Sequence, residues 1–288
     1  MSSPRFDEVR CLSPGGFHFM RWTEWGAADN PRLLLCVHGL TRVGRDFDLL
    51  AQALAPHYRV VCPDVAGRGR SDWLRQPLAY AIPQYANDMA MLLARLNAKS
   101  VAWVGTSMGG LIGMMLAGQP GSPIGRLLLN DVGPVFDAAA LKRIGDYLAQ
   151  PVRFDDLEQA TDYVTAISKP FGLTSRAQWR AITETVVVRD GDSYRMHYDP
   201  RIAIAFKQVT PEAAAAGESA LWALYDAIAA PTLLVRGENS DLLSRATAAQ
   251  MTARGPKAAL IEIAGIGHAP MFMDEFQIDI ARQFLLGE

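Results

Sequence analysis

Short apolar runs alternate with segments of helical spacing along most of the chain, and this alternation restricts the possible folds more than any other feature. The runs are unbroken by polar residues and are bounded by Gly, Pro, Asn or Asp, which is typical of strands buried on both faces. They are Leu33–Val37, Val60–Cys62, Val101–Val104, Leu127–Leu129, Thr232–Val235 and Ala259–Ile263. The helical segments are Phe47–Leu54, Tyr85–Leu96, Met108–Ala117, Ala246–Met251 and Phe272–Leu286. Together they predict an α/β fold, in which helices flank both faces of a mainly parallel central sheet.

Two parts of the chain depart from this alternation. The stretch Val9–Trp25 has Pro-Gly-Gly at its centre, which predicts an antiparallel hairpin at the edge of the sheet. Between residues 135 and 218 the helical patterns are Leu141–Leu148, Leu157–Ile167 and Arg176–Val188, with no strand-like run in a suitable context. We therefore expect a core domain of residues 1–134 and 219–288, and a helical insertion of residues 135–218 between the sixth and seventh strands.

The composition excludes several classes of protein. A formal net charge of −2 and an apolar content of 50% argue against disorder and against a nucleic-acid binder held by phosphate contacts. No apolar run is long enough to span a membrane, and the first residues lack the apolar stretch of a signal peptide. The three cysteines are too few and too scattered for a disulfide framework or a zinc ribbon. We expect a soluble, cytoplasmic protein that contacts neither nucleic acid nor membrane.

The string Gly105-Thr106-Ser107-Met108-Gly109 has the G-x-S-x-G pattern of a serine nucleophile. A strand-like run precedes the string and a helical segment follows it, so Ser107 is expected at a sharp strand-to-helix turn. Flanking glycines are needed there because a Cβ would clash with the neighbouring turn. The turn would present the hydroxyl at the carboxyl edge of the sheet, beside a helix N-terminus that favours developing negative charge.

A serine nucleophile needs a base, and the base needs an orienting carboxylate. Among five histidines, His268 lies in a glycine-containing loop after a buried strand, from which an imidazole can reach Ser107. Two carboxylates fit the order Ser…Asp…His. Asp241 is favoured because its strand would adjoin the strand that precedes His268, whereas Asp131 is the alternative and would otherwise be structural.

Residues after the run Leu33–Val37 are candidates for binding the oxyanion. The backbone N–H of Leu40, together with that of Met108, would form an oxyanion hole. Gly39 would permit the close approach, and His38 is expected to brace this loop rather than to take part in the chemistry.

With these residues in place, the sequence resembles the α/β-hydrolase superfamily. His38-Gly39, the string from Asp64 to Ser71 (D-x-x-G-x-G-x-S), the serine motif, Gly237…Asp241 and Gly267-His268 follow the order of that family. The resemblance implies that residues 135–218 form a helical cap over the active site, and that the Asp64–Ser71 turn is structural. Because Ser107 stands where dehalogenases and epoxide hydrolases of the superfamily carry Asp, the resemblance excludes those chemistries. The motifs imply neither a metal nor a cofactor.

The leading hypothesis is hydrolysis of a small carboxylic ester through an acyl-enzyme. A lactone, thioester, peracid or carbon–carbon substrate would use the same triad, and a ligand-binding receptor on this fold is a non-enzymatic alternative. Arg42 is a candidate contact for a substrate carboxylate, although a surface salt bridge with Asp46 or Asp48 is the plainer interpretation. Further candidate substrate contacts are Phe136, Phe171, Trp179 and Met271, although an ordinary core position is the plainer interpretation of each.

Overall fold

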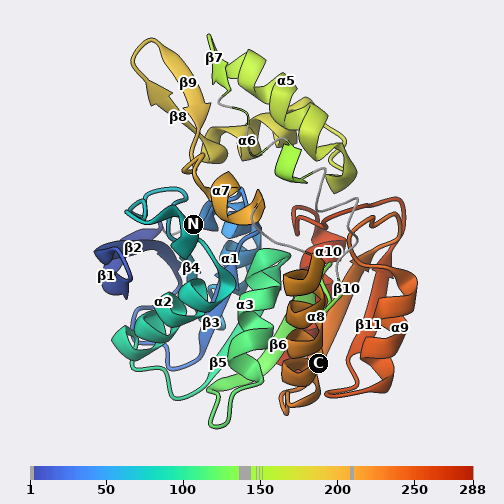
Figure 1. The fold of residues 1–288 in the computed structure, drawn as a ribbon. Coiled ribbons are helices and arrows are strands. Elements are labelled where there is room, and N and C mark those ends of the chain that lie inside the picture. The colour runs from blue at the N-terminus through green and yellow to red at the C-terminus, as the bar shows by residue number, and fades with distance from the viewer. Residues whose placement is uncertain are drawn as a thin grey trace.

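The computed structural model describes residues 3–135, 144–146, 148, 150, 152–207 and 211–287. An eight-stranded sheet runs through it in the order β1-β2-β4-β3-β5-β6-β10-β11 (Figure 1). The strands are β1 (Arg5–Ser13), β2 (Gly16–Trp25), β3 (Leu33–Val37), β4 (Arg59–Pro63), β5 (Val101–Thr106), β6 (Ile124–Asn130), β10 (Thr232–Gly237) and β11 (Ala259–Ile263). Neighbouring strands from β4 to β11 are parallel, which confirms the predicted α/β fold.

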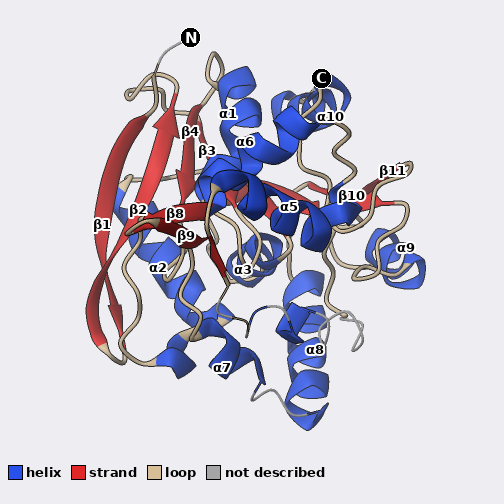
Figure 2. Cartoon of the chain, turned by 90° about the horizontal axis from the view of Figure 1, so that it is seen from above, coloured by secondary structure: helices blue, strands red, loops and turns tan. Residues whose placement is uncertain are grey.

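Helices cover both faces of this sheet (Figure 2). On one face, α1 (Asp48–Leu54) and α10 (Glu275–Leu286) contribute to one apolar core. On the other, α2 (Ile82–Arg95), α3 (Met108–Ala117), α8 (Pro211–Asp226) and α9 (Arg245–Ala253) contribute to a second, larger core. No helix in the described part of the chain combines the length and the apolarity needed to cross a lipid bilayer.

The predicted hairpin is confirmed at one edge of the sheet. Strands β1 and β2 pair antiparallel from Arg5↔Glu24 to Ser13↔Gly16, so the Pro-Gly-Gly stretch forms the turn. The opposite edge differs from the prediction, because β11 was expected to be buried on both faces. Only one neighbour, β10, pairs with it, and four of its five residues are exposed or half-buried.

The segment between β6 and β10 contains more than the expected helices. Its helices are α5 (Leu157–Ser168), the short 3-10 turn Lys169–Phe171, α6 (Arg176–Val186) and α7 (Ile202–Lys207). Beside them lies a three-stranded sheet of β7 (Arg153–Phe154), β9 (Ser193–Met196) and β8 (Val187–Asp190). The expectation of a purely helical insertion was therefore wrong, since the chain leaves α6 after Val186 and turns back at Gly191 to pair β8 with β9.

The expected domain boundary at residue 219 falls inside a helix, because α8 runs continuously through that position. The inserted segment lies at one end of the central strands, above β6 and β10 in Figure 1. Half of the segment predicted as Leu141–Leu148 lies outside the described residues, and Phe136 lies outside them as well. The fold thus places the loops that follow β3, β5, β6 and β11 beneath the inserted segment.

Candidate active site

Ser107 lies between β5 and α3 in a backbone conformation that non-glycine residues rarely adopt. Its φ is 52° and its ψ is −115°. Such a residue costs on the order of 1–3 kcal/mol and persists only where the surroundings enforce it. Val37 pairs with Gly105 in the sheet, so the ends of β3 and β5 are adjacent and the loop after β3 lies beside Ser107.

Close packing around the turn explains its glycines. A Cβ on Gly105 would lie 2.4 Å from the backbone of Gly109, and a Cβ on Gly109 would lie 2.0 Å from the carbonyl oxygen of Val37. Both distances are far below any real Cβ contact. The glycines therefore allow α3 to begin directly against β3 and β5, and this fixes the position of the serine.

His268 connects Ser107 to a buried carboxylate. Its Nε2 lies 3.0 Å from Ser107 Oγ, and its Nδ1 lies 2.7 Å from Asp131 Oδ2. The tautomer that satisfies both contacts carries its proton on Nδ1, which donates to Asp131, while Nε2 accepts from the serine hydroxyl. Asp131 is fully buried, and its two oxygens also accept from Gly237 N (2.9 Å) and Ser240 Oγ (2.6 Å).

Asp241, which was expected beside His268, does not occupy this position; the carboxylate found there is that of the alternative, Asp131. The premise about neighbouring strands holds, because β10 and β11 pair in parallel. However, β6 lies between β5 and β10, so an imidazole that reaches Ser107 passes over the end of β6, where Asp131 begins the next loop. The loop after β10 contributes the hydroxyl of Ser240 instead, and Asp241 itself is exposed.

Asn130 was not singled out in the sequence, yet it ties three parts of the site together. Its side-chain amide donates to Thr106 Oγ1 at 2.9 Å and to the carbonyl oxygen of Pro270 at 2.7 Å. These bonds join the residue before Ser107 to the loop that carries His268. An asparagine at the end of a predicted strand was the available signal, but only the fold shows which loops it meets.

The loop after β3 is held by His38, as expected. Its Nδ1 lies 2.7 Å from the carbonyl oxygen of Gly39, and its Nε2 accepts from Val65 N at 2.9 Å. Burial lowers the pKa of His38 to about 3, and the charges of Arg68 and Arg42 add to the effect, against the opposing Gly39 carbonyl. The imidazole is therefore neutral at physiological pH.

A pocket opens above Ser107 and His268 between the core and the inserted segment. From the predicted contacts it includes Leu40, Arg42, Phe171 and Met271. The remaining lining residues are His38, Gly39, Thr41, Asp46, Phe47, Thr106, Ile144, Ile167, Ser168, Ala269 and Pro270. Trp179 is instead a buried core residue on α6 and does not line this pocket. The polar reactive groups thus lie against a mostly apolar wall.

Arg42 is the cationic group in the described wall of this pocket. Its Nε and Nη2 donate to both carboxylate oxygens of Asp46 at 2.6 and 2.7 Å, and its guanidinium lies 5.6 Å from the centre of the Phe171 ring. Asp46 is therefore its partner, whereas Asp48 pairs with Arg45. The pair was expected at the surface, but both side chains are less than a tenth exposed.

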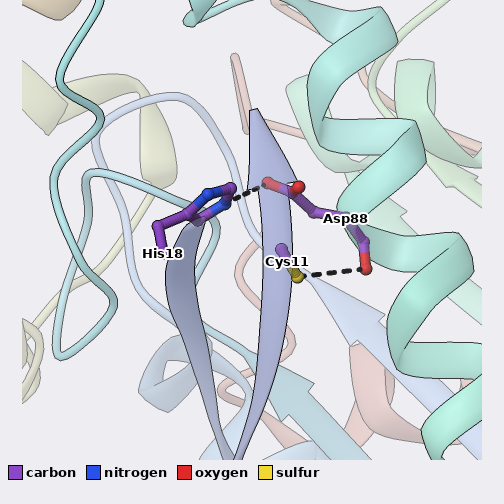
Figure 3. A group of neighbouring side chains, drawn as sticks. All are labelled: Cys11, His18 and Asp88. Carbon is purple, nitrogen blue, oxygen red and sulfur yellow. Dashed lines mark hydrogen bonds and ion pairs between the residues drawn. The ribbon is translucent and has the colours of Figure 1, made fainter. Parts of the chain in front are cut away.

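A second polar cluster, with side chains of the kind that hold metals, joins the edge hairpin to α2 (Figure 3). The donor atoms of Cys11, His18 and Asp88 lie within 4.8 Å of one another. His18 Nε2 lies 3.0 Å from Asp88 Oδ2, and Gln84 donates to Asp88 Oδ1 at 2.8 Å. Burial, and then the charge of Asp88, raise the pKa of the Cys11 thiol to about 12. We assign the cluster a structural role, since these contacts link β1 and β2 to α2, and β1 is four strands away from β5.

Comparison with known proteins agrees with this architecture. The model of the alpha/beta hydrolase family matches residues 34–279. A solved protein structure from Rickettsia typhi superimposes with a TM-score of 0.89 at 32% identity, over the full length of both chains. An alpha/beta hydrolase from Novosphingobium aromaticivorans superimposes with a TM-score of 0.86 at 33% identity, over 99% of both chains. The chain belongs to the alpha/beta hydrolase family, as the resemblance implied, and it is a hydrolytic enzyme.

One relative is similar enough to inform the choice of substrate. The 3-hydroxybutyrate-oligomer hydrolase of Cupriavidus necator is 54% identical over 290 aligned positions, which cover 99% of each chain. The similarity therefore includes the inserted segment as well as the core.

Proposed function

We propose that this protein hydrolyses the ester bonds of short 3-hydroxybutyrate oligomers through an acyl-enzyme on Ser107. The observation that carries the chemistry is the hydrogen-bonded series Ser107–His268–Asp131 at the base of the pocket. The substrate class rests on the relative that is 54% identical over the whole chain. Such oligomers are linear polyesters with a hydroxyl group at one end and a carboxylate at the other.

The reaction proceeds in two halves. Ser107 Oγ attacks the ester carbonyl carbon and transfers its proton to His268 Nε2, which lies 3.0 Å away. The tetrahedral intermediate collapses as the imidazolium returns that proton to the leaving alkoxide, so a hydroxy acid departs. Water then attacks the acyl-serine by the same route and releases the second acid. Asp131 holds the imidazole in the required tautomer and stabilises its charged form.

The amide groups of Leu40 and Met108 would bind the oxyanion. Met108 is the first residue of α3, where backbone N–H groups have no acceptor within the helix. Leu40 follows Gly39, on which a Cβ would lie only 3.7 Å from Ser107 Cβ. Each donor of this kind contributes about 3 kcal/mol to transition-state stabilisation.

Arg42 is placed to bind the free carboxylate of such a substrate. Asp46 occupies Nε and Nη2, which leaves Nη1 without an acceptor among the described residues. A Cβ on Gly39 would lie 3.7 Å from both Arg42 Cγ and Ser107 Cβ, so those two atoms are less than twice that distance apart. Arg42 and Ser107 also line the same pocket, so a carboxylate one hydroxybutyrate unit beyond the scissile ester would share that pocket with the guanidinium. The protein would then release monomers from the carboxyl end of the oligomer.

The three cysteines, all buried free thiols, support a reducing compartment such as the cytoplasm as the place of this activity.

The test compares wild type with Ser107→Ala, and with Ser219→Ala on the exposed side of α8 as a matched control. The substrates are the 3-hydroxybutyrate dimer and p-nitrophenyl butyrate. Wild type and the control should hydrolyse both, and Ser107→Ala should lose about 10⁴-fold or more in kcat. Turnover of p-nitrophenyl butyrate without any turnover of the dimer would refute the oligomer assignment. Undiminished turnover by Ser107→Ala would refute the serine mechanism as well.

A further inference from the structure

Arg68 is a fully buried arginine that forms no ion pair with any described residue. Its exposed fraction is 0%, and it takes part in none of the salt bridges in the described part of the chain. Burying a charge without a counter-ion costs several kcal/mol, so a guanidinium in this position needs a compensating role. The sequence motif that contains it, Asp64–Ser71, was expected to be structural only.

The guanidinium contacts both residues of the proposed oxyanion hole. Its Nε donates to the carbonyl oxygen of Leu40 at 2.8 Å, and its Nη2 lies 3.6 Å from the Sδ atom of Met108. It therefore lies between the loop after β3 and the first turn of α3, fully buried and outside the lining of the pocket.

The amide of Leu40 is fixed from both directions along the chain. His38 donates to the carbonyl oxygen of Gly39, which belongs to the same peptide group as the Leu40 N–H. In a planar trans peptide the N–H points away from that carbonyl, so this bond sets the direction of the N–H and polarises it. Arg68 holds the next peptide group through the carbonyl of Leu40. Neither dihedral of Leu40 can change without breaking one of the two bonds.

The remaining contacts of Arg68 are neutral. Its Nη1 donates to the carbonyl oxygen of Ala66 and to the hydroxyl of Tyr85, both at 2.8 Å. The Tyr85 ring lies 4.9 Å from the guanidinium carbon, which is a cation–π distance. Asp199 bonds to the Tyr80 hydroxyl and is paired with Arg201, and the charges of Asp88 and Asp199 both raise the pKa of the Tyr85 hydroxyl, which burial raises most. The positive charge of Arg68 is thus held by neutral acceptors and rings, and no described carboxylate forms an ion pair with it.

The turn that carries Arg68 is itself held rigidly. Gly69 N donates to the carbonyl oxygen of His197, and Asp199 N donates to the carbonyl oxygen of Gly67, both at 2.8 Å. His197 and Asp199 follow β9 in the inserted segment. The backbone on both sides of Arg68 is therefore tied to the connection between the core and that segment.

We propose that Arg68 is a positioning residue for the oxyanion hole: it fixes the Leu40 amide and adds a buried positive charge close to the forming oxyanion. The inference rests on the proposed acyl transfer at Ser107. A fixed, buried cation stabilises the negative charge that exists only in the tetrahedral intermediate, whereas it stabilises the neutral ester substrate little. The effect should therefore appear in kcat and not in KM.

The experiment measures kcat and KM for p-nitrophenyl butyrate, together with inhibition by an alkyl boronic acid, which forms a tetrahedral anion on the serine. The variants are Arg68→Gln, which removes the charge, and Arg68→Lys, which keeps it. Arg70→Gln is the matched control, because Arg70 lies in the same turn but binds Thr23 and the backbone of Trp22. Thermal unfolding of each variant is recorded alongside.

For Arg68→Gln we expect losses of about 10- to 100-fold in both kcat and boronate affinity, with KM within about twofold of wild type. Arg68→Lys should lose less than Arg68→Gln in both quantities. Arg70→Gln should keep the wild-type boronate affinity even if its melting temperature falls.

The proposal would be overturned if Arg68→Gln had the same boronate affinity and the same kcat as Arg70→Gln. Arg68 would then be a purely structural residue. Should Arg68→Gln not fold, Arg68→Lys decides the question, because the Nε bond to the Leu40 carbonyl is lost there even though the charge remains. Wild-type affinity and kcat in that variant would also overturn it. Turnover that persists in Ser107→Ala would instead refute the proposed function.

Discussion

Replacing Asp131 by Asn should invert the tautomer of His268 and remove the base from the reaction. Three donors converge on this carboxylate: Gly237 N on Oδ1, and Ser240 Oγ and His268 Nδ1 on Oδ2. If the asparagine oxygen keeps the bond to Gly237, its NH₂ group faces the imidazole. His268 must then present a lone pair at Nδ1, so its proton moves to Nε2, which can no longer accept from Ser107.

The expected loss follows from that inversion. In a serine triad, a neutral amide in place of the carboxylate lowers kcat by about 10⁴-fold, which corresponds to about 5.5 kcal/mol in the activation free energy. The matched control is Asp241→Asn, which makes the same chemical change at the exposed carboxylate favoured on sequence grounds. It should lower kcat by less than about twofold, because surface substitutions away from such networks have small effects.

The assay is the initial rate of p-nitrophenyl butyrate hydrolysis at saturating substrate, with circular dichroism to show that both variants are folded. An Asp131→Asn enzyme within tenfold of wild type would refute the reasoning. So would an Asp241→Asn enzyme that loses as much activity as Asp131→Asn.

Three further perturbations test separate parts of the account. The double variant Arg42→Gln/Asp46→Asn leaves no unpaired buried charge. It should lower the ratio of kcat/KM for the 3-hydroxybutyrate dimer to kcat/KM for its methyl ester by about 10- to 100-fold, whereas Asp46→Asn alone should keep that ratio. Because the folded-state pKa of His38 is depressed from 6.5 to about 3, its contribution to stability is complete above pH 6.5 and is lost as the pH falls toward 3. Urea titrations at several pH values should show that the free energy of unfolding falls by about 1.4 kcal/mol per pH unit over this range in wild type, and that His38→Gln lacks this contribution. The same slope in His38→Gln as in wild type would contradict the prediction. Gly109→Ala should abolish both folding and activity, because its Cβ would lie 2.0 Å from a carbonyl oxygen of β3. Gly217→Ala, in the open interior of α8, should instead raise the free energy of unfolding by about 0.5–1 kcal/mol. A folded, active Gly109→Ala would contradict the packing argument.

The serine turn and the edge hairpin were predictable because their signals are local. The glycine before Ser107 is required by a contact of 2.4 Å within the turn itself, and the Pro-Gly-Gly stretch reverses the chain between two strands that are neighbours in sequence. The parallel sheet was predictable for a similar reason, since each buried strand is followed by its own helix.

The acid was not predictable from chain order alone. Asp131 and Asp241 both follow buried strands and both precede His268, so the motif order fits either one. What decides between them is the path of the imidazole across the end of β6, which depends on the length and course of the loop after β11. Sequence spacing does not contain that distance.

The inserted sheet could have been anticipated. Asp190-Gly191 is a common hairpin signal, and Val187 and Val188 before it are β-branched. The helical spacing that begins at Arg176 masked the change, because it continues as far as the last residue of α6. The position of Arg68 had no such signal, since its contact with Leu40 joins residues 28 positions apart.

The central claim is that Ser107 is the nucleophile, and labelling tests it most directly. The protein is incubated with a fluorophosphonate, and the modified residue is located by peptide mass spectrometry. The account predicts a single adduct on Ser107, formed in wild type, strongly slowed in Asp131→Asn and absent from Ser107→Ala. An adduct on another residue that abolishes esterase activity, or full labelling of Ser107→Ala, would contradict it.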